Sequence, residues 1–337
     1  MCRSKFEVGF LGAVMGFCNM LNKLLLNSML DGKQPRVILC NDAGGGTFRN
    51  DLYDEYKANR PEAPIDLLPQ FDLIYEAAEA YGIVQVKAPG YEADDVIATL
   101  SQQALAQGLS VDILSGDKDL MQLITNSTSD YVGRINMIDP MTMSRMTHDT
   151  VIEKWGVPSP QLGDLLALAG DTADNIPGVP GIGPKIAAQL LQEYTTLEEV
   201  LRRSDEIKQV KRRENLQKYA DQARLSQALV ELVTDVPQEC FEVTPKEVAT
   251  KELHEIKMER MDPDRILEFY DSMGFYTIKK RLLERLDRQE QLTYQRDKYR
   301  QKPKPKPRPT SQTRSYSGRK GKKVDPPKPE DYEGVPF

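Results

Sequence analysis

The sequence predicts an α/β protein in which a doubly wound, parallel sheet is followed by a helical region and a basic tail. Three observations support this prediction. Over the first 150 residues, short apolar runs alternate with helical patterns, which is typical of parallel strands joined by helices. Beyond that point the strand patterns cease. From residue 296 the chain becomes rich in Lys, Arg and Pro, a composition that cannot bury a core and is expected to stay extended.

Turn residues separate the expected elements of the first 150 residues. Asp31-Gly32, Pro61, Pro89-Gly90 and Gly116 each end an apolar pattern. The apolar spacing between them predicts helices at 13–25, 47–59, 66–81, from 92 to about 105, and directly after Asp119. The short runs rich in Val and Ile predict strands at 36–40, 83–87, 110–115 and 131–138. The order of these elements is that of a sheet wound with crossover helices.

The helical region is expected to contain a Gly- and Pro-rich loop at 170–183 between two short helices. The helices expected on either side of that loop, and after it, cover 162–169, 184–193, segments within 197–233, and 262–288. No internal repeat is evident.

The composition fits a globular protein of more than one domain and excludes a wholly disordered chain. The chain has 337 residues, of which 39% are hydrophobic. The two histidines, His148 and His254, are too few for a His-rich metal site. The four cysteines form no CxxC pair, which argues against a zinc site and a disulfide framework and favours a reducing compartment. Carboxylates must therefore supply most acid–base or metal chemistry.

The net charge of −6 conceals an acidic body and a basic tail. Residues 296–323 carry +11, residues 324–337 carry −3, and residues 1–295 therefore carry −14. A basic segment of this kind is often an interaction tail for nucleic acid. We expect it to add affinity for DNA without sequence specificity, although a solubilising linker that never touches DNA has the same composition.

No stretch reaches the ~18–20 apolar residues of a membrane span, so we expect no membrane partner. The closest stretch covers residues 8–22 and lies behind two basic residues, as in a targeting segment. Asn19, Asn22 and Lys23 interrupt it and no small-residue cleavage site follows, so a buried core helix is the better interpretation.

Carboxylates gather where predicted strands end. The carboxyl ends of parallel strands share one edge of a sheet, where such folds place their ligands. Without a cation these acids would repel one another, and hard divalent ions take oxygen ligands. Acids in a first helical turn can also simply complement the helix dipole. The candidate metal ligands at this edge are Asp42, Glu92, Asp94, Asp95, Asp117 and Asp119.

Two further acids, Asp171 and Asp174, lie three residues apart in the sequence GDTADN. They are compatible with metal binding and equally with a turn followed by a helix N-cap.

The segment from Gly178 to Leu191, GVPGIGPKIAAQLL, matches the helix-hairpin-helix pattern. Backbone N–H groups at the start of a helix suit a phosphate oxygen and read no base sequence. A Gly- and Pro-rich connector is the alternative. The candidate DNA-binding residues are Gly178, Gly181, Gly183 and Lys185.

Basic residues follow two helical patterns. Lys57 and Arg60 share a helix face by their i,i+3 spacing, which fits a phosphate site but also an ordinary solvated face. A second basic run lies near the hairpin segment, where contact with a nucleic-acid backbone is plausible: Lys208, Lys211, Arg212, Arg213 and Lys218.

Four motifs in this order resemble the structure-specific 5′-nuclease (flap endonuclease) family. They are TFRNDLYDEYKANRP, YEADDVIATL, SGDKDLMQLI and LLALAGDTADNIPGVPGIGPKIAAQLL. The chain is similar to the 5′-to-3′ exonuclease domain of bacterial DNA polymerase I and its stand-alone relatives, over residues 12–235. The resemblance implies a PIN-like nuclease domain with a helical arch, a helix-hairpin-helix domain, a C-terminal helical segment and a disordered basic tail, at 1–155, 156–240, 241–290 and 291–337.

The resemblance also implies an enzyme that uses Mg²⁺ or Mn²⁺, two ions in such enzymes, to cleave 5′ flaps or successive 5′ nucleotides of DNA. All eight acids named above match the metal-binding acids of the family. Lys57 and Arg60 match the arch residues that hold the scissile phosphate. The loop from Gly178 to Lys185 matches the hairpin that grips duplex phosphate and, in relatives, a potassium ion. Partners implied are nicked or branched DNA and a DNA polymerase, and we expect a monomer.

The chain departs from the family at its start, because residues 1–8 lack the Asp that the family's first strand supplies to the metal site. We favour a chain that lacks an upstream segment over a natural variant with a damaged site, since the later ligands are retained. A non-catalytic protein that binds branched DNA is therefore the alternative function, and a PIN-type ribonuclease is a weaker one. The compartment stays open between bacterial cytosol, nucleus and organelle.

Overall fold

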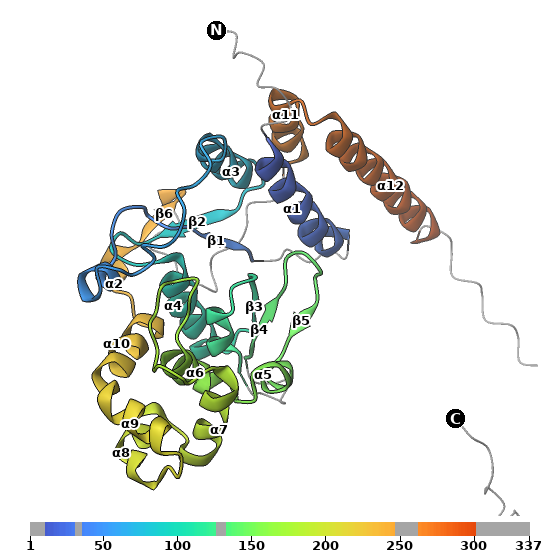
Figure 1. Ribbon diagram of the computed structural model, residues 1–337. Coiled ribbons are helices and arrows are strands. Elements are labelled where there is room, and N and C mark those ends of the chain that lie inside the picture. The colour runs from blue at the N-terminus through green and yellow to red at the C-terminus, as the bar shows by residue number, and fades with distance from the viewer. Residues whose placement is uncertain (1–10, 31–35, 126–132, 247–261, 301–337) are drawn as a thin grey trace, which may run out of the picture. The chain divides into compact units, whose positions relative to one another are not determined.

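The computed structural model describes residues 11–30, 36–125, 133–246 and 262–300 (Figure 1). The chain up to Asp287 forms one compact unit, and the chain from Arg288 belongs to a second. The expectations for residues 1–8 and for the tail from residue 301 lie outside the described residues.

The described strands form two three-stranded sheets, ordered β1-β2-β6 and β3-β4-β5. In each sheet the first two strands are parallel and the third is antiparallel to its neighbour. The four strands predicted from the sequence do pair in parallel, β1 with β2 and β3 with β4. They lie in two sheets, however, and each sheet ends in an antiparallel edge strand, so the prediction of a parallel sheet holds only in part. The strands are β1 (Ile38–Cys40), β2 (Val84–Lys87), β3 (Val111–Leu114), β4 (Ile135–Ile138), β5 (Arg145–Met146) and β6 (Glu242–Thr244).

Strand β6 also corrects the expectation that strands stop near residue 150. It follows the helical region and pairs with β2, with Val243 opposite Val86. A three-residue strand offers no alternating pattern of its own, so only its distant partner makes it a strand.

The helices before residue 156 largely follow the apolar spacing, with three differences, the first being that α5 (His148–Trp155) was not predicted from the sequence. The helix expected at 47–59 ends at Leu52, and the helix expected after Asp119 is a short 3₁₀ helix, η2 (Asp119–Leu123). The α-helices are α1 (Gly12–Leu30), α2 (Phe48–Leu52), α3 (Leu68–Ala80), α4 (Ala93–Ala106) and α5 (His148–Trp155).

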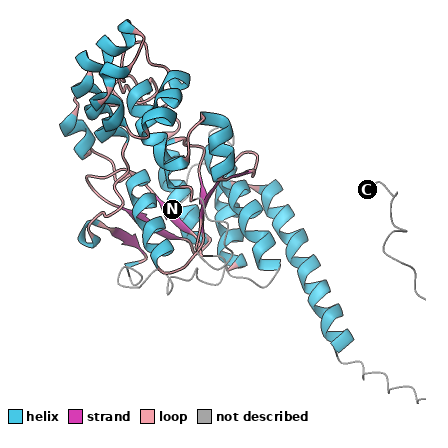
Figure 2. Ribbon diagram, turned by 90° about the horizontal axis from the view of Figure 1, so that it is seen from below, coloured by secondary structure: helices cyan, strands magenta, loops and turns pink. Residues whose placement is uncertain are grey.

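A run of helices with no described strand among them follows (Figure 2). Helix α6 has the predicted bounds, and α7 extends one residue further than expected. The α-helices here are α6 (Leu162–Ala169), α7 (Pro184–Tyr194), α8 (Leu197–Arg202), α9 (Val210–Lys218) and α10 (Ala220–Val230). Short 3₁₀ helices are η3 (Ser159–Gln161), η4 (Ser204–Glu206) and η5 (Gln238–Cys240).

The last helical pattern forms two helices, α11 (Pro263–Met273) and α12 (Tyr276–Arg300). Gly274 separates them, because it adopts the left-handed conformation that caps α11. The tail was predicted to be disordered from 291, but α12 continues to Arg300, since half of residues 291–300 are Gln, Lys or Arg, which favour helix. None of the described helices is long and apolar enough to cross a bilayer.

Helix α4 connects the two sheets, because it packs against β1, β2 and β3. One apolar cluster extends from β3 and β4 into α6, α7 and α10, through residues such as Ile113, Leu165 and Leu229. A second joins α1, α3 and the helices α11 and α12. The first cluster packs the helical region against the sheets. Because α6 belongs to that cluster, the loop after α6 lies near the end of β3.

Candidate metal centre and nucleic-acid interface

The first turn of α4 presents three of the candidate acids. The turn Pro89-Gly90 ends β2, and Glu92 follows as the N-cap of α4 in extended conformation. Asp42, just beyond β1, accepts a hydrogen bond from the Ala93 N–H at 2.8 Å. An acid at this position also suits the positive end of the helix dipole. The parallel pairing of β1 and β2 thus brings Asp42 to the start of α4, as the sequence predicts.

Asp117 and Asp119 lie in a tight turn after β3. The Ser115 hydroxyl accepts from the Asp117 N–H at 3.0 Å, and the Asp117 carboxylate accepts from the Asp119 N–H at 3.0 Å. These local bonds are those of an Asx turn, which explains why the chain enters η2 at Asp119. The turn fixes both carboxylates beside the loop that follows α6.

The loop after α6 carries Asp171 and Asp174 on a narrow turn. Asp171 and Ile176 exchange backbone hydrogen bonds, and the Asp171 carboxylate accepts from the Ala173 N–H at 3.1 Å. Both acids are more than nine-tenths buried. The turn interpretation of these residues therefore holds, and the same turn aims both carboxylates at Asp119.

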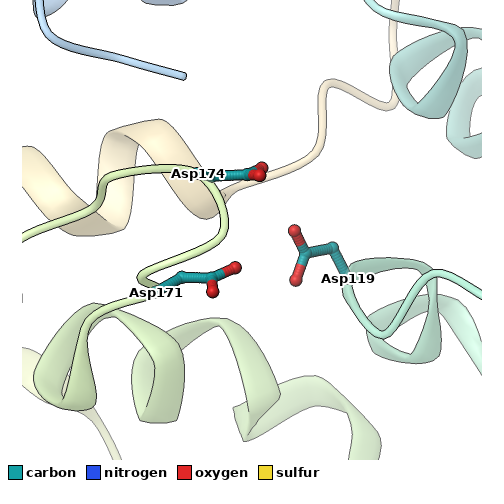
Figure 3. A group of neighbouring side chains, drawn as sticks. All are labelled: Asp119, Asp171 and Asp174. Carbon is teal, nitrogen blue, oxygen red and sulfur yellow. The ribbon is translucent and has the colours of Figure 1, made fainter. Parts of the chain in front are cut away.

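Asp119, Asp171 and Asp174 form the acidic cluster shown in Figure 3, with ligand oxygens within 4.8 Å of one another. The Asp119 Oδ1 atom is buried and has no hydrogen-bond partner among the described residues. A buried carboxylate oxygen that accepts no hydrogen bond destabilises the folded protein, unless a cation binds to it. Three carboxylates are ligands of the kind that Mg²⁺ and Mn²⁺ take, so the residues present fit a divalent ion.

Burial and mutual repulsion raise the pKa of two acids strongly. Burial, followed by the charge of Asp117, raises the pKa of Asp119 to about 7. Burial, again followed by Asp117, raises the pKa of Asp94 to about 7, with Glu92 and Asp42 contributing. Asp117 therefore raises the pKa of both Asp94 and Asp119, which shows that its carboxylate lies near both of them.

Three cations lie among these acids. Lys57 donates to Glu92 at 2.7 Å and lies 3.8 Å from Asp174, and Arg60 donates to Asp174. Lys118 donates to Asp171 at 2.6 Å. Lys118 was not predicted from the sequence as a site residue, although its place between two candidate acids in the motif SGDKD was a signal.

Tyr56 is a further residue that the sequence analysis missed. Its side chain is buried and its hydroxyl donates to Glu92 at 3.2 Å. Burial and the adjacent Glu92 charge raise the Tyr56 pKa, so the phenol stays protonated and remains a hydrogen-bond donor.

The residues around Lys57 are turns and not the expected helix. Lys57 has a φ of +58°, which α-helix excludes, and its N–H donates to the Asp174 carbonyl at 3.0 Å. The Asn59 amide donates to the Thr172 carbonyl, and the Asn175 amide donates to the Glu55 carbonyl. Docking on the loop after α6 thus replaces helical hydrogen bonds, and it still brings Lys57 and Arg60 to the same acid.

Asp95 differs from the other candidate ligands. It is fully buried, and both carboxylate oxygens accept from the Arg49 guanidinium, at 2.7 and 2.8 Å. The structure therefore pairs Asp95 with a cation of the chain itself and does not bring it to the acidic cluster.

The Gly- and Pro-rich loop joins α6 to α7, which pack against each other. Val179 and Ile182 are buried while Gly181 and Lys185 are exposed, and Gly183 is the N-cap of α7. Helix α9 lies against this loop, because Asn215 donates to the Pro180 carbonyl at 2.7 Å.

Gly178 is buried and its backbone polar groups are used inside the protein. Its N–H donates to the Ser226 hydroxyl at 3.2 Å, and its carbonyl accepts from Gln222. A Cβ atom there would lie 2.2 Å from the Gly170 nitrogen. Gly178 therefore allows two backbones to approach closely, while Gly181, Gly183 and Lys185 lie on the outer side of the turn.

Comparison with known proteins gives consistent matches. Residues 7–156 match the family model "5′-3′ exonuclease, N-terminal resolvase-like domain", and residues 157–255 match "5′-3′ exonuclease, C-terminal SAM fold". DNA polymerase I of Rhizobium leguminosarum is 44% identical over 280 residues, which is 82% of this chain and 26% of that protein. DNA polymerase I of Bacillus subtilis is 35% identical over 270 residues, 80% of this chain and 29% of that protein. The chain thus spans less than a third of the length of these relatives.

Solved structures share the fold. T5 5′-exonuclease with bound zinc ions has a TM-score of 0.54 at 20% identity, covering 80% of this chain and 90% of that one. The catalytic core of Rad2 in complex with a DNA substrate has a TM-score of 0.50 at 16% identity, covering 82% of this chain and 86% of that one.

Proposed function

This chain belongs to the 5′-3′ exonuclease family, and we propose that it is a metal-dependent nuclease that removes 5′ flaps and 5′ nucleotides from DNA. The observation that supports this most directly is the acidic cluster of Asp119, Asp171 and Asp174, with an unpartnered carboxylate oxygen, beside Lys57 and Arg60. Acids that hold cations, next to basic groups that hold a phosphate, fit metal-assisted hydrolysis of a phosphodiester.

We propose that the acids form two neighbouring ligand groups. Asp119, Asp171 and Asp174 make one, and Asp117 links it to a second group of Asp42, Glu92 and Asp94. Bound Mg²⁺ or Mn²⁺ ions supply an activated water and neutralise the leaving oxygen. Separate ligand groups that share one acid fit two ions in such a site.

Lys57 and Arg60 are proposed to bind the scissile phosphate. Both side chains are partly exposed and reach the acids from the segment that docks on the loop after α6. Both basic groups could donate to a phosphate oxygen and would stabilise the negative charge that develops on it. The buried Tyr56 hydroxyl holds Glu92 in place.

The turn between α6 and α7 is proposed to be a helix-hairpin-helix grip on duplex DNA. Gly181 and Lys185 are exposed there, and α9 brings Lys211 and Lys218 close to it through the contact of Asn215 with the turn. Backbone N–H groups and lysines at one surface suit phosphates and carry no base specificity. A potassium ion at this turn is part of the same proposal.

DNA with a 5′ flap, a nick or a branch is the proposed substrate, with the chain acting as a monomer. The relatives that it matches are DNA polymerases of more than three times the matched length, so a polymerase is the proposed partner.

A labelled 5′-flap duplex tests the proposal. We expect cleavage in Mg²⁺ and its loss in EDTA and in the Asp174→Asn variant, with Asp72→Asn, an exposed acid of α3, as the matched control. Equal cleavage by all three proteins would contradict the assignment. Tight, salt-sensitive binding of the flap with no turnover in Mn²⁺ would instead identify a non-catalytic protein that binds branched DNA.

A further inference from the structure

A buried ion pair outside the acidic cluster joins three segments of the chain. Arg49 is the second residue of α2 and Asp95 is the third residue of α4, and they are 1% and 0% exposed. The guanidinium donates to both carboxylate oxygens, at 2.7 and 2.8 Å. A buried pair of this kind adds little to stability unless its remaining donors and acceptors are also satisfied.

Three further hydrogen bonds of the pair go to the end of α10 and to the residues that follow it. The Arg49 Nε atom donates to the Leu229 carbonyl at 2.9 Å, and its Nη2 atom donates to the Glu231 carbonyl at 2.8 Å. The Asp95 carboxylate accepts from the Val233 N–H at 2.9 Å. The guanidinium therefore caps the last carbonyls of α10, and both partners bind the same segment of the helical region.

The opposite side of the pair contacts the candidate metal ligands. The Asp95 carboxylate accepts from the Glu92 N–H at 3.1 Å, and Arg49 lies 3.8 Å from the Glu92 carboxylate. Asp94 is the neighbour of Asp95 in the first turn of α4. The position of these two ligands therefore depends on where the pair holds the start of α4.

The helical region carries the other half of the site. Helix α10 packs against α6, and the loop after α6 presents Asp171 and Asp174 and continues into the turn proposed to grip DNA. A shift of α10 relative to α4 would therefore change the separation between the two groups of acids and between the DNA grip and the cleaved bond. Misplacement by about 1 Å can lower a rate by about 100-fold.

We propose that Arg49 and Asp95 are positioning residues. They fix the distances and orientations between the two groups of acids and the turn between α6 and α7 that is proposed to bind DNA. This inference rests on the proposed nuclease function. It assigns to Asp95 a role that acts through Glu92, Asp94 and α10, without contact with the phosphate. The planar fork of arginine is required, because one ammonium group cannot serve a carboxylate and two carbonyls in fixed directions.

The test compares the wild-type chain with the double variant Arg49→Met/Asp95→Leu, which removes both charges of the buried pair together and keeps a similar side-chain volume. Four backbone groups lose a partner, so cooperative urea unfolding of the variant is established first. The matched control is Arg145→Gln/Asp112→Asn, which removes an exposed Arg–Asp pair between β5 and β3. For each protein we would measure stability by urea unfolding and Mn²⁺ affinity by calorimetric titration in the absence of DNA. Cleavage of the flap gives the kcat and the lengths of the products.

We expect the Mn²⁺ affinity and the kcat of the double variant each to fall about 10–100-fold, as for other groups that orient metal ligands. The change in kcat should be larger than the change in KM. Its products should spread over neighbouring phosphodiester bonds, which a loss of stability alone would not produce. The control variant should match the wild type. A folded double variant with wild-type Mn²⁺ affinity and a single cleavage position would overturn the inference.

Arg49→Lys provides a second variant, should the double variant fail to unfold cooperatively. It keeps the charge and loses the fork, so we expect an intermediate loss of Mn²⁺ affinity and kcat, and wild-type values for both would refute the role. Absence of cleavage by the wild-type chain would defeat the proposed function, whereas the Mn²⁺ titration would still decide whether the pair positions the acids.

Discussion

Replacing Asp119 by Asn is expected to stabilise the metal-free protein. Asp119 faces Asp171 and Asp174 (Figure 3) and has one buried, unpartnered oxygen. An Asn side chain removes one negative charge and supplies N–H donors to the two remaining carboxylates. The gain should be greatest where the wild-type carboxylate is fully ionised.

The raised pKa sets the size of this effect. The pKa of Asp119 rises from 3.8 to about 7 on folding, and a difference of about three pH units corresponds to roughly 4 kcal/mol of lost stability once the group is ionised. Because the folded pKa lies above the unfolded one, the loss begins near pH 4 and grows until about pH 7. The variant should therefore gain up to about 4 kcal/mol near pH 8, about half of that near pH 5.5, and little below pH 4.

Urea unfolding in EDTA at these three pH values measures the difference in stability between Asp119→Asn and the wild type. The same urea titration in Mn²⁺ shows whether the wild type then becomes the more stable of the two. Bound ions stabilise the wild type by mass action and should stabilise Asp119→Asn much less. Asp72→Asn, at an exposed site, should stay within about 0.5 kcal/mol of the wild type throughout. If Asp119→Asn is no more stable than the wild type near pH 8 in EDTA, the cluster is not under electrostatic repulsion and the reasoning fails.

Four further predictions concern the site and the surfaces around it. Binding of Mn²⁺ should release protons near pH 6.5, since ions displace the protons held by Asp94 and Asp119, whose pKa values are about 7; calorimetry in buffers of different ionisation enthalpy measures the number released. Lys57→Met should lower single-turnover cleavage by about 100-fold while binding of the flap in Ca²⁺ changes little, and an unchanged rate would remove Lys57 from the phosphate site. Gly178→Ala should lower the stability by roughly 1–3 kcal/mol or more in thermal unfolding, because φ is +60° and the new Cβ would meet the Gly170 backbone; an unchanged Tm would contradict this close approach. Deletion of residues 296–323 should weaken binding to every DNA and flatten its dependence on salt, and an unchanged salt slope would show that the tail does not contact DNA.

The sequence located the candidate acids by a local argument that the structure partly supports. Asp42 and Glu92 lie at adjacent strand ends, and α6 has its predicted bounds. These features depend on apolar periodicity and on turn residues, which act over a few positions of the chain. The family motifs agree with the matched family because they preserve that local chemistry in a fixed order.

Features that involve distant residues were not accessible in this way. β6 is a strand only because β2 accepts it, and Lys57 leaves the helical pattern because Asp174 takes its N–H. The place of Lys118 in the motif SGDKD was a signal in the sequence, but its partner Asp171, 53 residues further along the chain, was not visible there. For β6 and for the segment around Lys57, strand pairing or a few long-range hydrogen bonds outweigh a local preference of less than about 1 kcal/mol per residue.

The acid-rich motifs, the alternation of strands and helices and the basic tail were determined by the sequence itself, because each depends on composition or short spacing. Tertiary structure decided which acids face one another and which are paired with cations of the chain. Asp95 illustrates the difference. By spacing it equals Asp94, but one residue along a helix turns a side chain by about 100°, which directs Asp95 to the buried Arg49. Helix geometry and the packing of α10 thus separate two acids that are neighbours in the sequence.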